Sequence, residues 1–224
     1  MNQWKIVHND GTIEPKQGTY EADPFLFEHG GKLWLFYELY DYKKGVIAVR
    51  EFPDGEPQVI LERSHHLSFP CVWEQNGKIF MMPETGAGDL IILECETFPD
   101  RWVEVYRRGG NFGDSVYHDG HIFTTEGSDH NLRIFRSGEL AYAEPRMNSR
   151  CAGHLFTENG VLVRPTQLGE GGYGMGVILK SIDLNSPTFE ERELRRILPT
   201  GNETGLHTYN TVGNVTVWDV RYKL

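Results

Sequence analysis

The chain has 224 residues, of which 32 are acidic and 22 are basic, so its formal net charge is −10. This charge argues against a nucleic-acid partner or an anionic membrane surface, because both attract basic proteins. Three scattered cysteines are too few for a disulfide framework or a zinc site. The N-terminus lacks a signal pattern and no apolar run reaches membrane length, so we expect a cytoplasmic protein without membrane insertion.

A short phrase recurs five times: an apolar run, a turn with glycine, and a second apolar run. The first copy runs from Phe25 to Phe36, and the second, from Cys71 to Met82, repeats it almost position for position. The turn glycines recur at intervals of 40–53 residues: Gly31, Gly77, Gly120, Gly160 and Gly213. Repeats of about 40–50 residues that open with a β-hairpin are typical of propeller blades. The sequence therefore predicts an all-β, five-bladed β-propeller that forms a single domain over residues 1–224.

In chain order, the blades are expected at residues 22–63, 68–108, 114–145, 151–198 and 205–224. The last copy has room for only two or three strands. A ring cannot leave a sheet edge open without exposing unpaired backbone groups. The apolar segment from Trp4 to Val7 belongs to no other blade. We therefore expect this N-terminal strand to complete the last blade and to close the ring with both ends of the chain.

Polar residues recur where the inner two strands of each blade begin and end. Both positions lie on one face of a propeller, so we expect these side chains to meet around the axis. They are Asp23, Asp114, His154 and His207 at strand starts, and Glu38, Glu84, Glu126, Gln167 and Asp219 at strand ends. Crowded, desolvated carboxylates have raised pKa values and suit acid–base chemistry on a glycosidic bond. Each residue alone is also an ordinary turn or strand-end residue.

Three other side chains near this face, and the two histidines, have two interpretations each. Arg150 and Arg164 would either bind a ligand or form salt bridges with ring carboxylates. Tyr173, in a Gly-rich connection, would either stack on a sugar ring or merely lie in a linking loop. His207 and His154 would each either hold a central ion or water or be a hydrogen-bonded core residue.

The order of several short phrases resembles that of the five-bladed propellers of glycoside hydrolase family 43. More specifically, it is similar to the N-terminal domain of glucosamine inositolphosphorylceramide transferases and its bacterial relatives, some of which are joined to formyltransferase-like domains. The resemblance covers essentially residues 20–212. It is carried by Ala22–Leu26, Leu35–Glu38, Leu67–Pro70, Met82–Thr85, Phe98–Trp102, Asp114–Ser115, Arg164–Gln167, Tyr173–Gly174 and Gly205–His207.

The resemblance implies roles for three residues. Asp23 stands where family 43 enzymes keep their general base, and Asp114 where they keep the aspartate that tunes the acid. His207 matches their central histidine, which often neighbours a calcium ion or a water; no cofactor is otherwise required. Those enzymes place the general-acid glutamate at the start of blade four, where this chain has Ala152-Gly153-His154. Glu84 is the best substitute for this acid, and Glu126 is the second choice.

Two functions follow. The first is a carbohydrate-active, glycosidase-like enzyme that acts on a glycosidic bond at the propeller mouth, with Asp23 as base or nucleophile, Glu84 as acid and Asp114 as pKa tuner. The alternative is a non-catalytic propeller that binds a sugar or glycoconjugate and supports a partner glycosyltransferase or formyltransferase. The missing acid of blade four favours the alternative, and the aspartate pair favours the enzyme. The ligand would also contact Glu38, Glu126, Arg150, His154, Arg164, Gln167, Tyr173 and His207.

Overall fold

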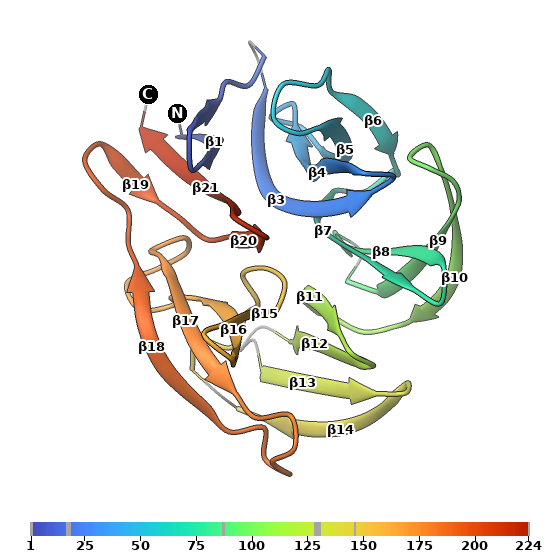
Figure 1. Ribbon diagram of the computed structural model, residues 1–224, viewed down its shortest axis with the longest axis vertical. Coiled ribbons are helices and arrows are strands. Elements are labelled where there is room, and N and C mark those ends of the chain that lie inside the picture. The colour runs from blue at the N-terminus through green and yellow to red at the C-terminus, as the bar shows by residue number, and fades with distance from the viewer. Residues whose placement is uncertain (1, 17–18, 87, 128–130, 146, 224) are drawn as a thin grey trace.

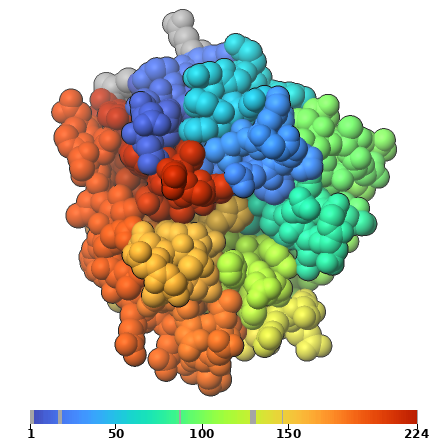
Figure 2. Space-filling view, viewed as in Figure 1, coloured from blue at the N-terminus to red at the C-terminus, as the bar shows by residue number. Residues whose placement is uncertain are grey.

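Five antiparallel β-sheets surround one axis in the computed structural model, which describes residues 2–16, 19–86, 88–127, 131–145 and 147–223 (Figure 1). Every regular element in these ranges is a β-strand. The prediction of an all-β, five-bladed propeller is confirmed, and its treatment as a single domain stays a prediction. The blades pack side by side, with no wide channel on the face in view (Figure 2). None of the described segments forms a helix long and apolar enough to span a membrane.

Blades one and two each contain four strands in sequential order from the axis outwards. Blade one consists of β3 (Tyr20–His29), β4 (Lys32–Tyr40), β5 (Gly45–Glu51) and β6 (Gln58–Leu61). Blade two consists of β7 (Leu67–Gln75), β8 (Lys78–Thr85), β9 (Leu90–Thr97) and β10 (Arg101–Arg108). Short turns join the inner two strands, as the repeated Gly-containing phrase predicts.

Blades three and four follow the same plan. Blade three consists of β11 (Phe112–His118), β12 (His121–Glu126), β13 (Asn131–Arg136) and β14 (Glu139–Glu144). Blade four consists of β15 (Phe156–Glu158), β16 (Val161–Gln167), β17 (Val177–Ile182) and β18 (Glu191–Ile197). The Gly-rich connection of blade four lies between β16 and β17.

Blade five is built from both ends of the chain. Its order from the axis is β20 (Tyr209–Val212), β21 (Val215–Lys223), β1 (Asn2–His8) and β2 (Gly11–Ile13), with the short β19 (Glu203–Gly205) also paired to β21. β1 runs antiparallel to β21 over its whole length. The predicted closure by the N-terminal strand is confirmed. β2 supplies a further strand that the sequence did not indicate.

Buried apolar side chains between the blades form the core. Phe25 and Phe36 of blade one and Val116 and Phe123 of blade three are fully buried in its largest cluster. Ile6 of the closing strand is also fully buried, in a cluster shared with blade one. The closing strand therefore adds core packing as well as backbone hydrogen bonds to the ring.

The inner strands of blades one, two and three share a bulge near their start. Two residues of the inner strand lie opposite one residue of its partner in β3, β7 and β11. The first bulge residue has a positive φ each time: 52° at Asp23, 48° at Phe69 and 48° at Asp114. This conformation is unfavourable for a residue other than glycine, most of all for a bulky one, and persists only where neighbouring groups hold it. The bulges place one residue per blade at the same end of the axis.

The closing strand predicts a stability effect that can be measured. Ile6→Ala should lower the free energy of unfolding by about 2–4 kcal/mol, because it leaves a cavity in a fully buried position. Lys5→Ala on the same strand removes a surface ion pair with Glu14 and a contact with the Tyr222 ring, and should cost less than about 1 kcal/mol. Urea unfolding of both variants tests this, and equal losses would contradict the role of Ile6 in closure.

Candidate functional site

Carboxylate side chains bind the backbone N–H groups of the bulges, from one blade to the next. Asp219 of β21 accepts a hydrogen bond from the N–H of Asp23, with 3.1 Å between nitrogen and oxygen. The Asp23 carboxylate accepts from the N–H of Phe69 at 3.2 Å, and Glu84 of β8 accepts from the N–H of Asp114 at 2.7 Å. These bonds join blade five to one, one to two, and two to three. Each of these acidic side chains thus stabilises the bulge of the next blade.

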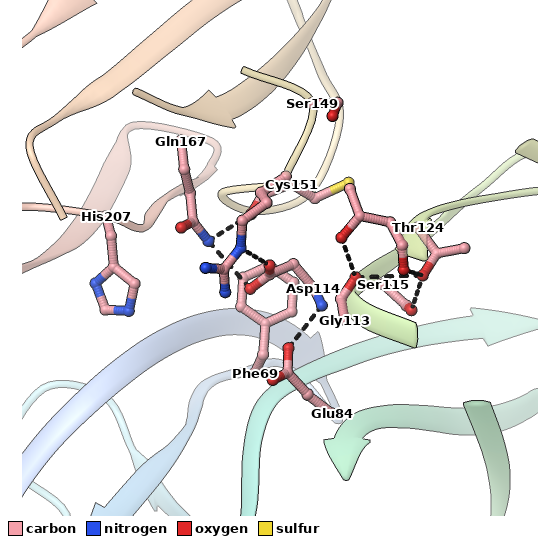
Figure 3. Close-up of polar contacts among 12 residues, drawn as sticks. Phe69, Glu84, Gly113, Asp114, Ser115, Thr124, Ser149, Cys151, Gln167 and His207 are labelled. Carbon is pink, nitrogen blue, oxygen red and sulfur yellow. Dashed lines mark hydrogen bonds and ion pairs between the residues drawn. The ribbon is translucent and has the colours of Figure 1, made fainter. Parts of the chain in front are cut away.

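The carboxylate of Asp114 extends these contacts between blades to blade four (Figure 3). One carboxylate oxygen accepts a hydrogen bond from Gln167 Nε2 at 3.0 Å, and the other is ion-paired with Arg150 Nε. Gln167 Nε2 also donates to the backbone oxygen of Cys151 at 3.0 Å, which fixes its orientation. Asp114 is therefore held by two side chains from blade four as well as by its own bulge.

His207 lies between two aspartates and joins both ends of the ring. Its Nδ1 is 2.8 Å from Asp219 Oδ2, and its Nε2 is 3.1 Å from Asp23 Oδ1. Asp219 Oδ1 also accepts the backbone N–H groups of His207 and Thr208, each at 3.0 Å. Only 5% of Asp23, 3% of His207 and none of Asp219 is exposed. Both oxygens of Asp219 and Oδ2 of Asp23 thus accept hydrogen bonds inside the protein, and Oδ1 of Asp23 forms an ion pair with His207.

The charge of His207 follows from this geometry. Burial opposes its protonation, but Asp219 and Asp23 outweigh burial and raise its pKa to about 10. One potential ligand atom from each of the three residues lies within 4.8 Å of the others, which is close enough for a metal ion. An imidazolium, however, has no lone pair for a metal, and N–H donors already bind both aspartates. The donor set fits a protonated histidine, and the calcium ion or water that the resemblance implies beside His207 stays a prediction.

Two glutamates at the mouth have raised pKa values. Burial and then the nearby Asp114 charge raise the pKa of Glu84 to about 8, so it is protonated at neutral pH. Burial and then Asp23 raise the pKa of Glu38 well above its ordinary value. Its Oε1 lies 3.2 Å from His66 Nε2. Neutral and ionised carboxyls therefore lie side by side, which suits both acid–base chemistry and hydrogen bonding to hydroxyl groups.

Aromatic rings cover one side of the cluster. The ring centroid of Trp4, on the closing strand, is 4.4 Å from that of His207, and the ring centroid of Tyr173 is 5.0 Å from that of His207. The guanidinium of Arg150 lies 5.3 Å from the centre of the Tyr173 ring. Tyr173 is 52% exposed and presents aromatic surface to solvent. Sequence reasoning missed Trp4, because only the pairing of β1 with β21 brings it to the mouth.

Two pockets flank Arg150. One, of about 310 Å³, is lined by groups that include Glu84, Asp114 and the glycines beside them, and the other, of about 280 Å³, by groups that include Gln167 and Tyr173. Arg150 lines both. The two pockets together offer carboxyl, amide, guanidinium and aromatic groups around a concave surface, which is the kind of lining that binds small polar ligands.

Eight predicted site residues therefore gather at one end of the axis. Hydrogen bonds, ion pairs, ring contacts or charge interactions link each of them to others of the group. They are Asp23, Glu38, Glu84, Asp114, Arg150, Gln167, Tyr173 and His207. Their catalytic and ligand-binding roles stay predictions.

Glu126 does not join this group, contrary to our expectation. The partner of Gly113 in β12 is Thr125, whereas Glu84 holds the equivalent place in blade two, opposite the residue before the bulge. Glu126 is one residue further along, and successive side chains of a strand point to opposite sides. Its carboxylate pairs instead with Arg133 Nε at 2.8 Å. The error is a register shift of one residue.

Arg164 and His154 are also placed differently from the prediction. Arg164 is fully buried, and its Nε lies 2.5 Å from the carboxylate of Glu191 on β18. It therefore forms a salt bridge, but with a carboxylate that is not one of those expected at the mouth. His154 lies deeper along the axis, with its ring centroid 5.0 Å from that of Phe25 and its Nδ1 3.9 Å from Cys71 Sγ. Burial lowers the pKa of His154 to about 4, which makes it a neutral core residue.

At the start of blade four, Gly153 has no room for a side chain. Gly153 has a φ of 151°, and a Cβ added there would lie 2.1 Å from the backbone oxygen of Tyr209. The backbone of blade five therefore occupies the space that a side chain at this position would need. The packing of blades four and five therefore excludes a glutamate at position 153.

Comparison with known proteins agrees with the sequence-based resemblance. The family described as "Glucosamine inositolphosphorylceramide transferase 1, N-terminal" matches residues 11–107. Glucosamine inositolphosphorylceramide transferase 1 of Arabidopsis thaliana is 28% identical over 223 residues, covering 85% of this chain and 29% of that protein. The protein of the same name from Oryza sativa subsp. indica is 28% identical over 204 residues, covering 75% and 27%. The expected resemblance is confirmed. The chain spans less than a third of the length of these relatives.

Solved structures with the same fold include glycosidases. An exo-β-1,3-galactanase from Clostridium thermocellum matches with a TM-score of 0.66 and 13% identity, covering 91% of this chain and 55% of that one. A GH43 endo-arabinanase from Bacillus licheniformis matches with a TM-score of 0.55 and 11% identity, covering 89% and 87%. At these identities the likeness establishes the propeller fold alone.

The raised pKa of His207 predicts a pH-dependent stability. Because the folded state favours the imidazolium, the stabilisation from His207 is complete below its ordinary pKa of 6.5 and is lost as the pH rises through about 10. The difference in free energy of unfolding between the wild type and His207→Gln should therefore shrink between pH 6.5 and 10. Urea unfolding across this range measures it. A constant difference would show that His207 is neutral in the folded protein.

The burial of Arg164 predicts a structural role. Arg164→Met should lower the free energy of unfolding by about 3–5 kcal/mol, because it leaves the Glu191 carboxylate without its nearest cation. Arg195→Met, which breaks an exposed pair with Glu158 in the same blade, should cost about 1 kcal/mol or less. Thermal or urea unfolding compares the two. A small loss for Arg164→Met would contradict this role.

Proposed function

We propose that this propeller is a non-catalytic domain that binds a sugar or glycoconjugate at its mouth and supports a transferase. One observation carries the proposal: the candidate base is buried and ion-paired. Asp23 Oδ1 faces the His207 imidazolium, Asp23 Oδ2 accepts the N–H of Phe69, and the residue is 95% buried. A general base needs a free oxygen within hydrogen-bond reach of the water that it activates.

The space around Gly153 supports the same proposal. A glycosidase of the two-carboxylate type needs an acid on the other side of the scissile bond. The start of blade four has no room for a side chain at Gly153, and Asp114 is bound to Arg150 and Gln167. The groups that remain accessible at the two pockets suit hydrogen bonding and stacking. The similarity to transferases, of which this chain spans less than a third, suggests that a separate catalytic domain would use the bound ligand.

A glycosidase remains the second candidate, and Glu84 is the observation that favours it. Its carboxyl is protonated at neutral pH, lines an open pocket, and interacts electrostatically with Asp23. A protonated carboxyl of this kind can donate a proton to a leaving oxygen. This mechanism would require Asp23 to exchange its contact with His207 for one with water.

One set of measurements separates the two candidates. A glycan array identifies a ligand, and isothermal titration calorimetry then measures its affinity alongside an assay of glycoside hydrolysis. We expect binding without turnover, and Tyr173→Ala should weaken binding about tenfold, equivalent to ~1.4 kcal/mol, because it removes exposed aromatic surface. Tyr222→Ala, on β21 beside Lys5, is the matched control and should bind normally. Turnover that disappears in both Asp23→Asn and Glu84→Gln would establish the glycosidase instead.

A further inference from the structure

A separate pocket, of about 280 Å³, lies between blades two and three. It shares no lining residue with the two mouth pockets. Trp73 and Phe80 from blade two and Tyr117 and Phe135 from blade three form much of its wall. The end of β10 and the turn between β13 and β14 lie beside each other at this edge of the ring (Figure 1), where Arg108 Nη1 donates to the backbone oxygen of Gly138 at 3.3 Å.

Three stacked aromatic rings make one side of this pocket apolar. The Trp73 ring stacks on Tyr117, with centroids 4.6 Å apart and planes 18° apart, and on Phe80 at 5.6 Å and 25°. Trp73 is 9% exposed, and its indole N–H has no hydrogen-bond partner among the residues that the structure describes. Val105 at the rim is 52% exposed. The pocket therefore leaves apolar surface in contact with water, which favours an apolar occupant.

One cation lies at this pocket and has no carboxylate partner. Arg108 lines the pocket, with its guanidinium 4.4 Å from the centre of the Phe135 ring. Within the described ranges it forms no ion pair, whereas the adjacent Arg107 pairs with Asp89 and Glu104. A planar guanidinium held against a ring, with N–H groups left over, is arranged to bind a carboxylate.

We propose that this inter-blade pocket binds an amphipathic monocarboxylate. Its apolar tail would lie against Trp73, Tyr117 and Phe80, and its carboxylate would bind Arg108. Both halves of the ligand follow from the lining: the stacked rings favour a hydrocarbon body, and the unpaired guanidinium favours a single anionic head. This inference stands apart from the proposed sugar site, because the two sites share no residues.

Decanoate below its micellar concentration is a suitable probe. In ¹H–¹⁵N spectra of the whole chain, the indole N–H resonance of Trp73, assigned through Trp73→Phe, should shift saturably as decanoate is added. Arg108→Gln should weaken decanoate binding at least tenfold, because it removes a charge-assisted hydrogen bond. The same variant should leave the binding of decan-1-ol, which has no carboxylate, unchanged.

Two other variants keep the test decisive. Arg107→Gln removes a neighbouring surface charge outside the pocket and should bind decanoate normally, and Arg108→Lys should retain part of the affinity because it keeps the charge. The proposal is overturned if the Trp73 resonance does not shift. It is equally overturned if the shift never saturates, or if Arg108→Gln weakens decanoate and decan-1-ol alike.

Discussion

The ring depends on one kind of interaction: a carboxylate from one blade that accepts the bulge N–H of the next. Asp219 is the first of these acceptors and the most deeply buried. It lies on β21 directly opposite Ile6 of the closing strand, and it binds backbone groups from blades one and five. Closure of the ring and the electrostatics of the mouth therefore share a residue. The protonated His207 makes this arrangement possible, since it offsets the charge of the two buried aspartates beside it.

This network gives the acidic residues at the mouth a structural role. A concentration of carboxylates at one end of a propeller first suggests chemistry, because a fold can form without it. Here Asp219, Asp23 and Glu84 each hold a strained backbone position of a neighbouring blade. The pKa of Glu84 is raised and that of Asp219 is lowered for structural reasons, and a perturbed pKa alone does not identify a catalyst. What remains available to a ligand is the accessible surface on either side of Arg150.

The sequence predicted the parts of the fold that depend on local pattern. The recurring Gly turns gave the blade number, and the short last repeat required Trp4–Val7 to complete it, because an open edge is unfavourable. It could not reveal the bulges, since nothing in a single sequence shows that Asp23 or Phe69 has a positive φ. Glu126 was misplaced because a shift of one residue reverses the direction of a side chain. The sequence also could not show contacts between strands that are distant along the chain, such as the one that brings Trp4 to His207.

The seam between β1 and β21 has a mechanical consequence. Asn2 is paired with Lys223, so the two strands leave their ladder at the same end. Tension applied through these two residues would load the hydrogen bonds one pair at a time and peel the strands apart, whereas opposite ends would load them all together in shear. Peeling requires less force. Force applied at Asn2 and Lys223 would thus open the ring first at blade five. Trp4 and Asp219 would leave the mouth while the other four blades, each continuous in sequence, remain folded.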